Sequence, residues 1–421
     1  MKIKQLAVVA VIGGALILSA CGSSDDDKAS DPASVGGITA ADVATALEYV
    51  GGQGGKADPS LEPFTIGFVN NQGAVPSFDE MEANADAAVA FVNDKLGGID
   101  GHPVKLDKCY IQSEEDGQKC AAQLLGNKDI KIANLGLSVF GNKTFYDLIG
   151  GKFPVINTGA VTPADSTSKS VYNLDAGGFG AMQSVGDLAE KAGYKKLAIL
   201  TTNNPAGKFL LDEIVLPDLK ARGITATTAY LPDTSTTPDY VSALQTVGAK
   251  DADAIEALAS GVAACVSLHD AMKQVSLVKP VIAVNACAGD PMPEKTGGGP
   301  QGWSMTGLSE LVLLDTPQAK VNRNVIKAEG KEKFVNLNVG PKNFGDILTI
   351  SRWAKAIGYD KLTPAAFEDQ IAKFTGPAWL VPGEMKCGSN KLQIGICGGS
   401  VPNAVFEDGK WKSLEPYVTA K

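Results

Sequence analysis

The cysteines are the residues whose number and spacing most clearly permit chemistry. Apart from Cys21, the chain has six, which form three couples close in sequence: Cys109 and Cys120, Cys265 and Cys287, and Cys387 and Cys397. In an oxidising compartment such couples form disulfides, and each short loop contributes roughly 3 kcal/mol on the chain-entropy model. Metal binding is the alternative, but the chain has only two histidines and no C-x-x-C motif. We therefore predict these three disulfides, no metal and no cofactor.

A serine and a lysine also have a spacing that permits chemistry. Ser166 and Lys169 fit the S-x-x-K element of serine penicillin-binding enzymes, and residues 295–297 fit their K-T-G element. The middle element of those enzymes is absent between them, and the polar segment around Ser166 indicates a loop instead of the required buried helix. Neither His102 nor His269 has a serine or cysteine partner that the sequence identifies. The sequence therefore predicts that the chain is not an enzyme.

The elements that must position any site alternate between strands and helices. The predicted strands are FTIGFVNN, PVKLDKCYI, IKIANLG, FPVINTG, KKLAILTT, ITATTAYL, ADAIEALAS and KPVIAVNA. Between them lie helical patterns such as MEANADAAVAFVNDKLGG and GKFLLDEIVLPDLKARG. Such alternation produces parallel sheets that are covered by helices on both faces. The predicted fold class is α/β.

The N-terminal residues predict export and anchoring. Lys2 and Lys4 precede an apolar run that is shorter than the ~20 residues of a membrane-spanning helix, so residues 1–20 have the features of a signal peptide. Residues 18–21 resemble the bacterial lipobox, which implies lipidation of Cys21 and a membrane-anchored, extracytoplasmic or periplasmic location. Residues 21–60 are rich in Gly, Ser, Ala and Asp, which predicts a flexible tether in which ITAADVATALEYV could form a short helix.

The charge of the chain limits its partners. The formal net charge is −9, whereas nucleic-acid binding requires clustered lysine and arginine. We therefore expect no nucleic-acid partner. Separately, we expect the protein to be a monomer.

Two longer segments resemble the type I periplasmic binding proteins of ABC importers, in the branch named for branched-chain amino acids. These segments are LGGIDGHPVKLDKCYIQSEEDGQKCAAQLL and IANLGLSVFGNKTFYDLIGGKFPVINTGAVTPADS. The resemblance covers roughly residues 62–415. It implies two Rossmann-like lobes joined by three hinge crossovers, with lobe 1 at 61–176 and 307–378 and lobe 2 at 177–306 and 379–421.

The expected site lies in the cleft between the lobes. Ligands of open α/β sheets collect beyond the carboxyl ends of the strands, where helix N-termini present N–H groups. The candidate ligand-binding residues in these loops are Phe78, Ser138, Val139, Phe140, Thr158, Gly159, Ala160, Asn203, Asn204, Ser260, Gly261, Asn285 and Ala286.

Departures from the family pattern bear on the ligand. Amino-acid binders of the family usually carry a threonine where Val161 falls and aromatic hydroxyls where Ala206 and Val262 fall. They also place an acid directly after the VIAV-type strand, whereas here no acidic residue lies between that strand and Asp290. An unpaired ammonium in a dry cleft is unfavourable by several kcal/mol. We therefore expect a small, partly apolar molecule, such as an aromatic carboxylate, in place of a standard amino acid.

The resemblance also implies partners and alternatives. The expected partners are a small-molecule ligand, an ABC permease with its ATPase subunits, and the membrane through the N-terminal lipid. One alternative is a binder of branched-chain amino acids or amides. Another is the ligand-sensing partner of a membrane receptor, because the same two-lobed body can serve either role.

Overall fold

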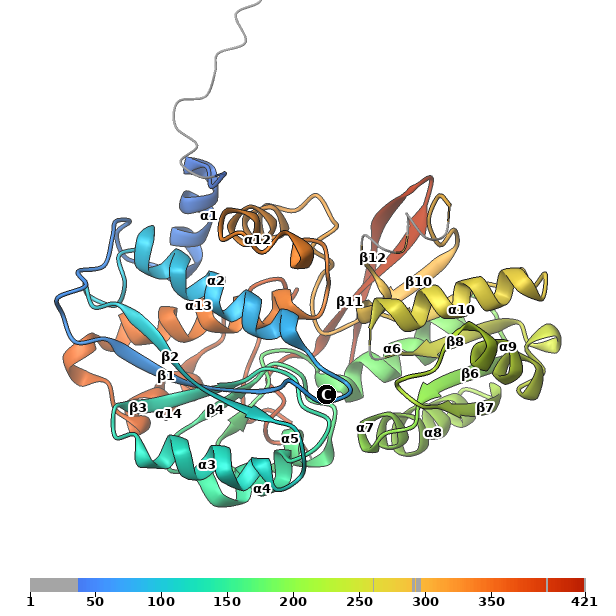
Figure 1. Ribbon diagram of the computed structural model, residues 1–421, viewed down its shortest axis with the longest axis horizontal. Helices are drawn as coiled ribbons and strands as arrows, with labels where there is room; N and C mark the ends of the chain where they lie inside the picture. The colour runs from blue at the N-terminus through green and yellow to red at the C-terminus, as the bar shows by residue number, and fades with distance from the viewer. Residues whose placement is uncertain (1–36, 260, 290–291, 293–296, 391–392, 420–421) are drawn as a thin grey trace, which may run out of the picture.

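The computed structural model describes residues 37–259, 261–289, 292, 297–390 and 393–419. The predicted signal peptide, the lipidation site Cys21, the candidate ligand residue Ser260 and the acid Asp290 lie outside the described residues. Figure 1 shows two α/β lobes side by side. The predicted fold class is confirmed.

Lobe 1 is built on a five-stranded parallel sheet. Its strands are β1 (Phe64–Asn71), β2 (Val104–Ile111), β3 (Ile130–Leu135), β4 (Val155–Asn157) and β5 (Val171–Tyr172), in the order β2-β1-β3-β4-β5. All of β1 is buried, as expected for a strand with helices on both faces. One face packs on α2 (Asp79–Asp94), α13 (Gly340–Ile357) and α14 (Pro364–Lys373), and the other packs on α3 (Asp116–Gly126) and α4 (Asn142–Ile149). The short α5 (Pro163–Thr167) and α12 (Pro317–Ala328) complete the lobe.

Lobe 2 is built on a seven-stranded sheet. Its strands are β6 (Lys196–Thr202), β7 (Thr225–Leu231), β8 (Ala254–Leu258), β9 (Val281–Val284), β10 (Trp303–Thr306), β11 (Ser400–Glu407) and β12 (Lys410–Val418). Their order is β12-β11-β10-β9-β8-β6-β7, and only the pairs that involve β11 and β12 are antiparallel.

Helices cover both faces of the lobe 2 sheet. On one face lie α6 (Gly177–Lys191) and a continuous helical segment of α7 (Pro205–Phe209), the π-helix η1 (Leu210–Val215) and α8 (Leu216–Ala221). On the other lie α9 (Thr237–Thr246) and α10 (Val262–Gln274). The remaining short 3-10 helices are η2 (Ala249–Asp251), η3 (Asn285–Cys287), η4 (Glu332–Phe334) and η5 (Tyr359–Lys361).

The chain passes between the lobes three times, after β5, after β10 and after α14. Backbone hydrogen bonds tie these crossovers to one another. Asn173 N–H donates to Gly395 O at 2.8 Å, and Cys397 N–H donates to Asn173 O at 3.0 Å. Glu310 N–H of the second crossover donates to Leu380 O of the third at 2.7 Å. The crossovers therefore form one connected hinge region.

Within the predicted tether, the segment ITAADVATALEYV does form a short helix, α1 (Ala40–Val50), which lies on the surface of lobe 1. Thr39 and Asp42 form a capping box at its start. Tyr49 is buried, its hydroxyl lies 2.7 Å from Thr349 Oγ1, and it accepts a hydrogen bond from Trp379 N–H at 3.1 Å. The Gly-rich flanks predicted flexibility, but the apolar face of the short helix finds a partner on α12 and α13.

None of the helices in the described part of the chain combines the length and the apolar character that a bilayer-crossing segment needs.

Candidate functional site

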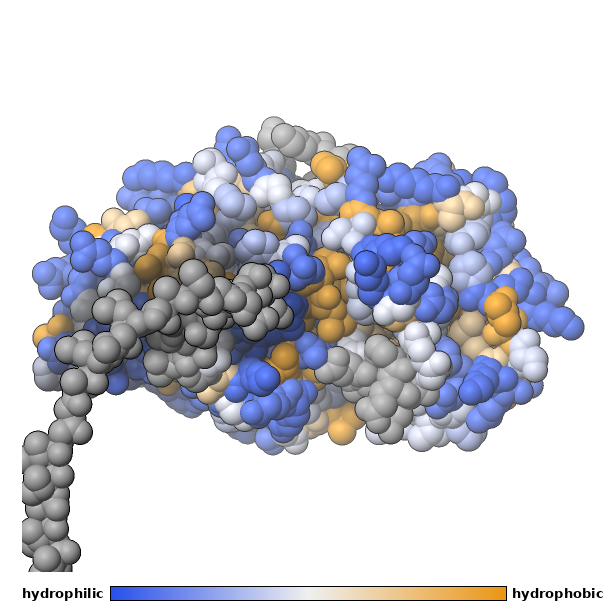
Figure 2. Space-filling view, turned by 90° about the horizontal axis from the view of Figure 1, so that it is seen from above, coloured by the Kyte–Doolittle hydropathy of each residue, from blue (hydrophilic) through white to orange (hydrophobic). Residues whose placement is uncertain are grey.

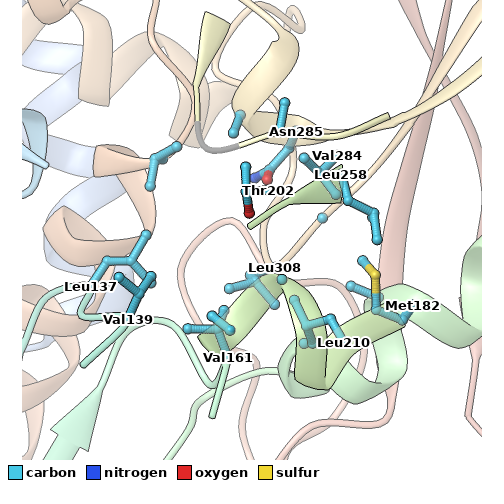
Figure 3. A pocket seen from close by; sticks show the side chains of 18 of the residues that line it. Leu137, Val139, Val161, Met182, Thr202, Leu210, Leu258, Val284, Asn285 and Leu308 are labelled. Atoms are coloured by element: carbon cyan, nitrogen blue, oxygen red, sulfur yellow. The ribbon is translucent and has the colours of Figure 1, made fainter. Parts of the chain in front are cut away.

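A cavity of about 130 Å³ lies between the two lobes, and we call it the cleft pocket. Its lobe 1 wall consists of Phe78, Leu137, Val139, Val161 and Val339. Its lobe 2 wall consists of Gly178, Ala181, Met182, Thr202, Asn204, Ala206, Gly207, Leu210, Leu258, Ala259, Val284, Asn285, Ala286, Thr306, Gly307 and Leu308. Figure 3 shows these side chains converging from both lobes on one space. For comparison, a dry apolar cavity of about 150 Å³ holds a benzene molecule.

The pocket residues stand where strands of the two sheets end. Val139 follows β3, Val161 follows β4, Leu258 ends β8, and Thr306 ends β10. Because all of these strands are parallel, their carboxyl ends lie at one edge of each sheet, and the two edges face each other. The fold therefore places the pocket where ligands of open α/β sheets bind.

The two lobes touch across the cleft. Ala206 of α7 packs with Phe78, Met81 and Val139 of lobe 1 in one apolar cluster, and each of these side chains is at most 5% exposed. Figure 2 shows hydrophobic surface between two halves that are otherwise mostly hydrophilic. This cluster is a direct apolar contact between the two lobes.

The polar side chains of the pocket are few. Asn204 Oδ1 accepts from Gly207 N–H at 2.8 Å and so caps α7, while Asn285 Nδ2 donates to Asn338 O at 3.0 Å. Thr306 Oγ1 donates to Ala181 O at 3.3 Å. Thr202 contributes a further hydroxyl to the pocket wall. Within the described part of the chain, no charged side chain lines the pocket.

Several predicted site residues line the cleft pocket, namely Phe78, Val139, Asn204, Asn285 and Ala286. Contact of these residues with a ligand stays a prediction. Val161 and Ala206, which depart from the family pattern, also line it, whereas Val262 does not. The departures at Val161 and Ala206 therefore make the pocket wall more apolar.

Other predicted residues do not reach the pocket surface: Ser138, Phe140, Thr158, Gly159, Ala160, Asn203 and Gly261. Ser138 is fully buried, and its hydroxyl donates to Phe140 O at 2.6 Å. Thr158 Oγ1 donates to Asn343 Oδ1 at 3.0 Å. The Ser138 hydroxyl satisfies a backbone carbonyl of its own loop, and the Thr158 hydroxyl ties its loop to α13. Both hydroxyls therefore hold loops in place and do not face the cavity.

The remaining five residues lie in loops or pack away from the pocket. Gly159 N–H donates to Asn157 Oδ1 at 3.2 Å, and Ala160 O accepts from Gly178 N–H at 2.7 Å, at the junction with α6. Asn203 is exposed, and Gly261 precedes α10. Phe140 packs between the apolar clusters of lobe 1.

The sequence reasoning missed much of the apolar wall. Leu258 and Val284 are the last residues of β8 and β9, and both lie within two residues of the end of a predicted strand, so the strand ends were a usable signal. Ala181 and Met182 of α6 had no comparable signal, because their place in the pocket depends on long-range packing.

Two carboxyl groups, the half-buried Glu80 and the fully buried Glu256, lie close to the pocket wall. Glu80 of α2 accepts hydrogen bonds from Val339 N–H at 3.3 Å and from Gly340 N–H at 3.0 Å, at the start of α13. Burial raises the pKa of Glu80 to about 7. Glu256 lies two residues before Leu258 on β8, and burial raises its pKa to about 8. Residues two positions apart in a β-strand point to the same face of the sheet, so the Glu256 and Leu258 side chains lie on the same face.

A third buried cluster lies at the hinge. Lys342 of α13 contacts Asp346, and its Nζ lies 3.6 Å from Asp175 Oδ2 on the first crossover. Asp175 Oδ1 accepts from Gly177 N–H at 2.6 Å, and Asp175 O accepts from Gly398 N–H at 2.9 Å. Burial raises the pKa of Asp175 to about 6. Asp175 thus connects two crossovers and lobe 1.

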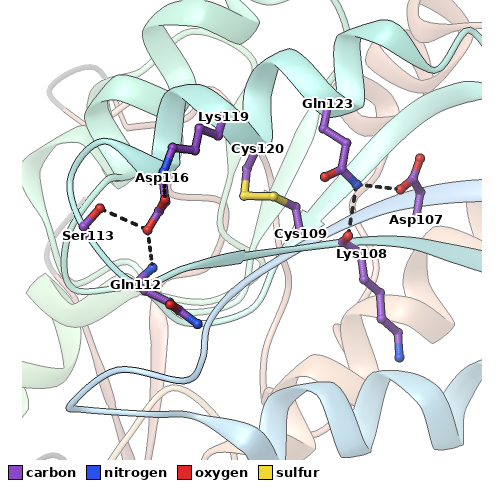
Figure 4. The surroundings of a disulfide bond; sticks show 9 residues. All are labelled: Asp107, Lys108, Cys109, Gln112, Ser113, Asp116, Lys119, Cys120 and Gln123. Atoms are coloured by element: carbon purple, nitrogen blue, oxygen red, sulfur yellow. Dashed lines mark hydrogen bonds and ion pairs between the residues drawn. A yellow bond between two sulfur atoms is a disulfide. The ribbon is translucent and has the colours of Figure 1, made fainter.

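The three predicted disulfides are confirmed: Cys109–Cys120, Cys265–Cys287 and Cys387–Cys397. Figure 4 shows the first, which joins β2 to α3 beside the loop that Asp116 organises. The second joins α10 to η3 at the pocket, and the third closes a loop of the third crossover. Each bond fixes a loop that leads to or from the cleft. Among the residues that the structure describes, no group of three potential metal ligands occurs.

Comparisons with known proteins agree with this geometry. Residues 63–387 match the model of a family described as "Periplasmic binding protein". No sequence among the curated proteins matches the chain. The chain is structurally similar to a solute-binding protein of an ABC transporter from R. palustris in complex with 4-hydroxybenzoate (TM-score 0.69, 16% identity, 86% of this chain and 98% of that chain covered).

Two further solved structures are similar. One is a solute-binding protein of an ABC transporter from R. palustris in complex with benzoate (TM-score 0.70, 14% identity, covering 85% of this chain and 97% of that chain). The other is a branched-chain amino acid ABC transporter protein from Thermus thermophilus with bound valine (TM-score 0.69, 12% identity, covering 86% and 98%). At these identities the likeness establishes the fold.

Proposed function

The chain belongs to the periplasmic binding protein family, and from this premise we propose that it captures a small solute in the cleft pocket and delivers it to the permease of an ABC importer. The observation that carries this proposal is the apolar cavity lined by residues of both lobes. A solute that touches both walls stabilises the closed arrangement by its additional contacts there. Moving such an equilibrium from mostly open to mostly closed takes roughly 5.5 kcal/mol of differential binding.

The proposed solute has an apolar body and a carboxylate, as in an aromatic acid. The volume of the pocket suits a single ring, and its wall is almost entirely apolar. Thr202 supplies a hydroxyl that can donate to a carboxylate oxygen, and the amide of Asn285 also lines the pocket (Figure 3). A standard amino acid is disfavoured, because no carboxylate lines the described part of the pocket to pair with its ammonium.

The solute class can be tested by calorimetric titration of the purified chain with benzoate, 4-hydroxybenzoate, leucine and valine. We expect the benzoates to bind more tightly than the amino acids, and Thr202→Val to weaken benzoate binding by roughly tenfold. Tight leucine binding without benzoate binding would contradict the proposed class.

Ala206→Trp tests the location of the solute. The larger side chain would hold Phe78 and Val139 away, and overpacking of roughly 1–3 kcal/mol should weaken benzoate binding about ten- to a hundredfold. Ala221→Trp is the matched control, because Ala221 is exposed at the end of α8 in the same lobe. Equal losses in the two variants would contradict binding in the cleft.

Lipid anchoring is the second part of the proposal. The residues around Cys21 resemble a lipobox, and a lipidated Cys21 would hold the protein at the outer face of the cell membrane, the chain continuing into α1 of lobe 1. Two acyl chains suffice for stable anchoring. Mass spectrometry of the mature N-terminus should detect a diacylglyceryl mass on Cys21, and a free thiol there would contradict anchoring.

A further inference from the structure

A second cavity, of about 220 Å³, lies behind the cleft pocket at the second crossover. We call it the hinge pocket. It is bounded by the end of β10, by the crossover residues Ser309 and Glu310, and by β11 and β12. Asn285, Thr306 and Gly307 line both cavities. The two cavities are therefore neighbours with a common wall.

The common wall is tightly packed. A Cβ atom at Gly307 would lie 2.4 Å from Asn285 Cγ, so the Asn285 side chain rests directly on the Gly307 backbone. Asn285 Nδ2 is committed to Asn338 O, which leaves Asn285 Oδ1 as an acceptor. The amide thus separates an apolar cavity from a more polar one.

The hinge pocket contains polar groups that the described residues do not satisfy. The Ser309 side chain is 2% exposed, and its Oγ has no hydrogen-bond partner in the part of the chain that the structure describes. The half-buried Glu310 carboxyl has neither an ion pair nor a hydrogen bond with any described residue. Burial raises the pKa of Glu310. A hydroxyl that is removed from water without a partner is unfavourable, and such groups are usually paired in native proteins. The half-buried Glu310 carboxyl places a negative charge beside it.

We propose that the hinge pocket is a second binding site, which takes the ammonium end of a small primary amine. An ammonium group carries three donors and no acceptor, and it would meet Glu310, Ser309 Oγ and Asn285 Oδ1, which can all accept. The positive charge of the ammonium offsets the negative charge of the Glu310 carboxylate. The apolar side chains of Met305, Leu311 and Leu314 suit the carbon chain of the amine. A divalent metal is a poorer match, because Ca²⁺ takes six to eight oxygen ligands, several of them carboxylates.

Occupancy of the hinge pocket would act on the hinge. The N–H of Glu310 donates to Leu380 O, which joins the second crossover to the third. An amine held between Glu310 and lobe 2 would therefore connect the crossovers to β11 and β12. This inference goes beyond capture of a solute in the cleft pocket and does not depend on it.

The test is titration of the purified chain with ethylammonium and putrescine, followed by calorimetry and thermal unfolding. Tetramethylammonium at equal ionic strength is the reference, because it has the same charge and no N–H donor. We expect saturable binding of the primary amines that tetramethylammonium does not reproduce. Glu310→Gln should weaken this binding at least about tenfold, since it removes a charge-assisted hydrogen bond.

Three variants make the result decisive. Ser309→Ala should weaken amine binding less than Glu310→Gln does. It provides a second test of the site if Glu310→Gln folds poorly. Glu329→Gln, a carboxyl outside the hinge pocket, should bind amines like the parent chain. Ala206→Trp, which fills the cleft pocket, should also retain amine binding. The proposal is overturned if primary amines do not bind saturably, if Glu310→Gln binds them normally, or if Ala206→Trp abolishes their binding.

Discussion

Replacing Glu256 with glutamine should remove a large part of the pH dependence of stability. Glu256 lies in the middle of β8 with no exposed surface, and neither of its carboxyl oxygens has a hydrogen-bond partner among the described residues. Burial, the sole cause, raises its pKa from 4.5 to about 8. At neutral pH the folded protein therefore holds this group protonated and uncharged, whereas the unfolded chain ionises it.

The sign follows from proton binding. Between the unfolded pKa near 4.5 and the folded pKa near 8, the folded state binds more protons than the unfolded state. The free energy of unfolding therefore falls as the pH rises through this window, and it levels off above it. One pKa unit corresponds to about 1.4 kcal/mol, so the whole window corresponds to roughly 5 kcal/mol. Between pH 5 and pH 9 the expected loss is about 4 kcal/mol.

The assay is urea unfolding of the parent chain and of Glu256→Gln at pH 5, 7 and 9. Other groups titrate equally in both proteins, so the difference between the two curves isolates Glu256. We expect the variant to gain about 4 kcal/mol relative to the parent chain between pH 5 and pH 9. Glu384→Gln, which makes the same chemical change at an exposed position, should run parallel to the parent. Parallel curves for Glu256→Gln would refute the reasoning, because they would mean that Glu256 ionises as readily in the folded protein as in water.

Two other changes test how the body is held together. Tyr49→Phe should lower the free energy of unfolding by about 1–2 kcal/mol, because it removes only the hydroxyl that meets Thr349 and Trp379. Tyr49→Ala should lower it by about 3–5 kcal/mol and should speed hydrogen exchange in α1. Unchanged exchange in Tyr49→Ala would contradict the docking of this helix. Replacing Cys109 and Cys120 together by serine should destabilise lobe 1 by roughly 3 kcal/mol in urea unfolding, and a loss below about 1 kcal/mol would show that the loop needs no covalent constraint.

Local signals in the sequence were enough to predict the strands β1–β4 and β6–β9 and the three disulfides, but not the short β5 or the strands β10, β11 and β12. The segment that forms β1 is rich in Thr, Ile, Phe and Val, and the cysteines of each bond are 10 to 22 residues apart. Such features depend on neighbouring residues and on the compartment. The order of strand and helix units, together with the family resemblance, then led to the two lobes.

The cavity itself was predicted less well, for physical reasons. Ser138 and Thr158 stand in the predicted loops, but the Ser138 hydroxyl bonds within its own loop and the Thr158 hydroxyl bonds to Asn343 of α13. Met182 enters the pocket from α6, and no local pattern indicates which turn of a helix reaches a distant cleft. Glu256 belongs to a predicted strand, yet both faces of that strand are buried, so alternation along the strand could not reveal the environment of the carboxyl.

The docking of α1 decides which lobe can move. The described chain enters lobe 1 at Ile38, which is buried in the lobe 1 core, and continues into α1, which Tyr49 fastens to α13 and to Trp379. Whatever restrains the N-terminus therefore restrains lobe 1, and lobe 2 becomes the part that swings when the cleft opens. For a protein attached at a surface, a distance label on β7 should consequently report larger excursions from that surface than one on β2.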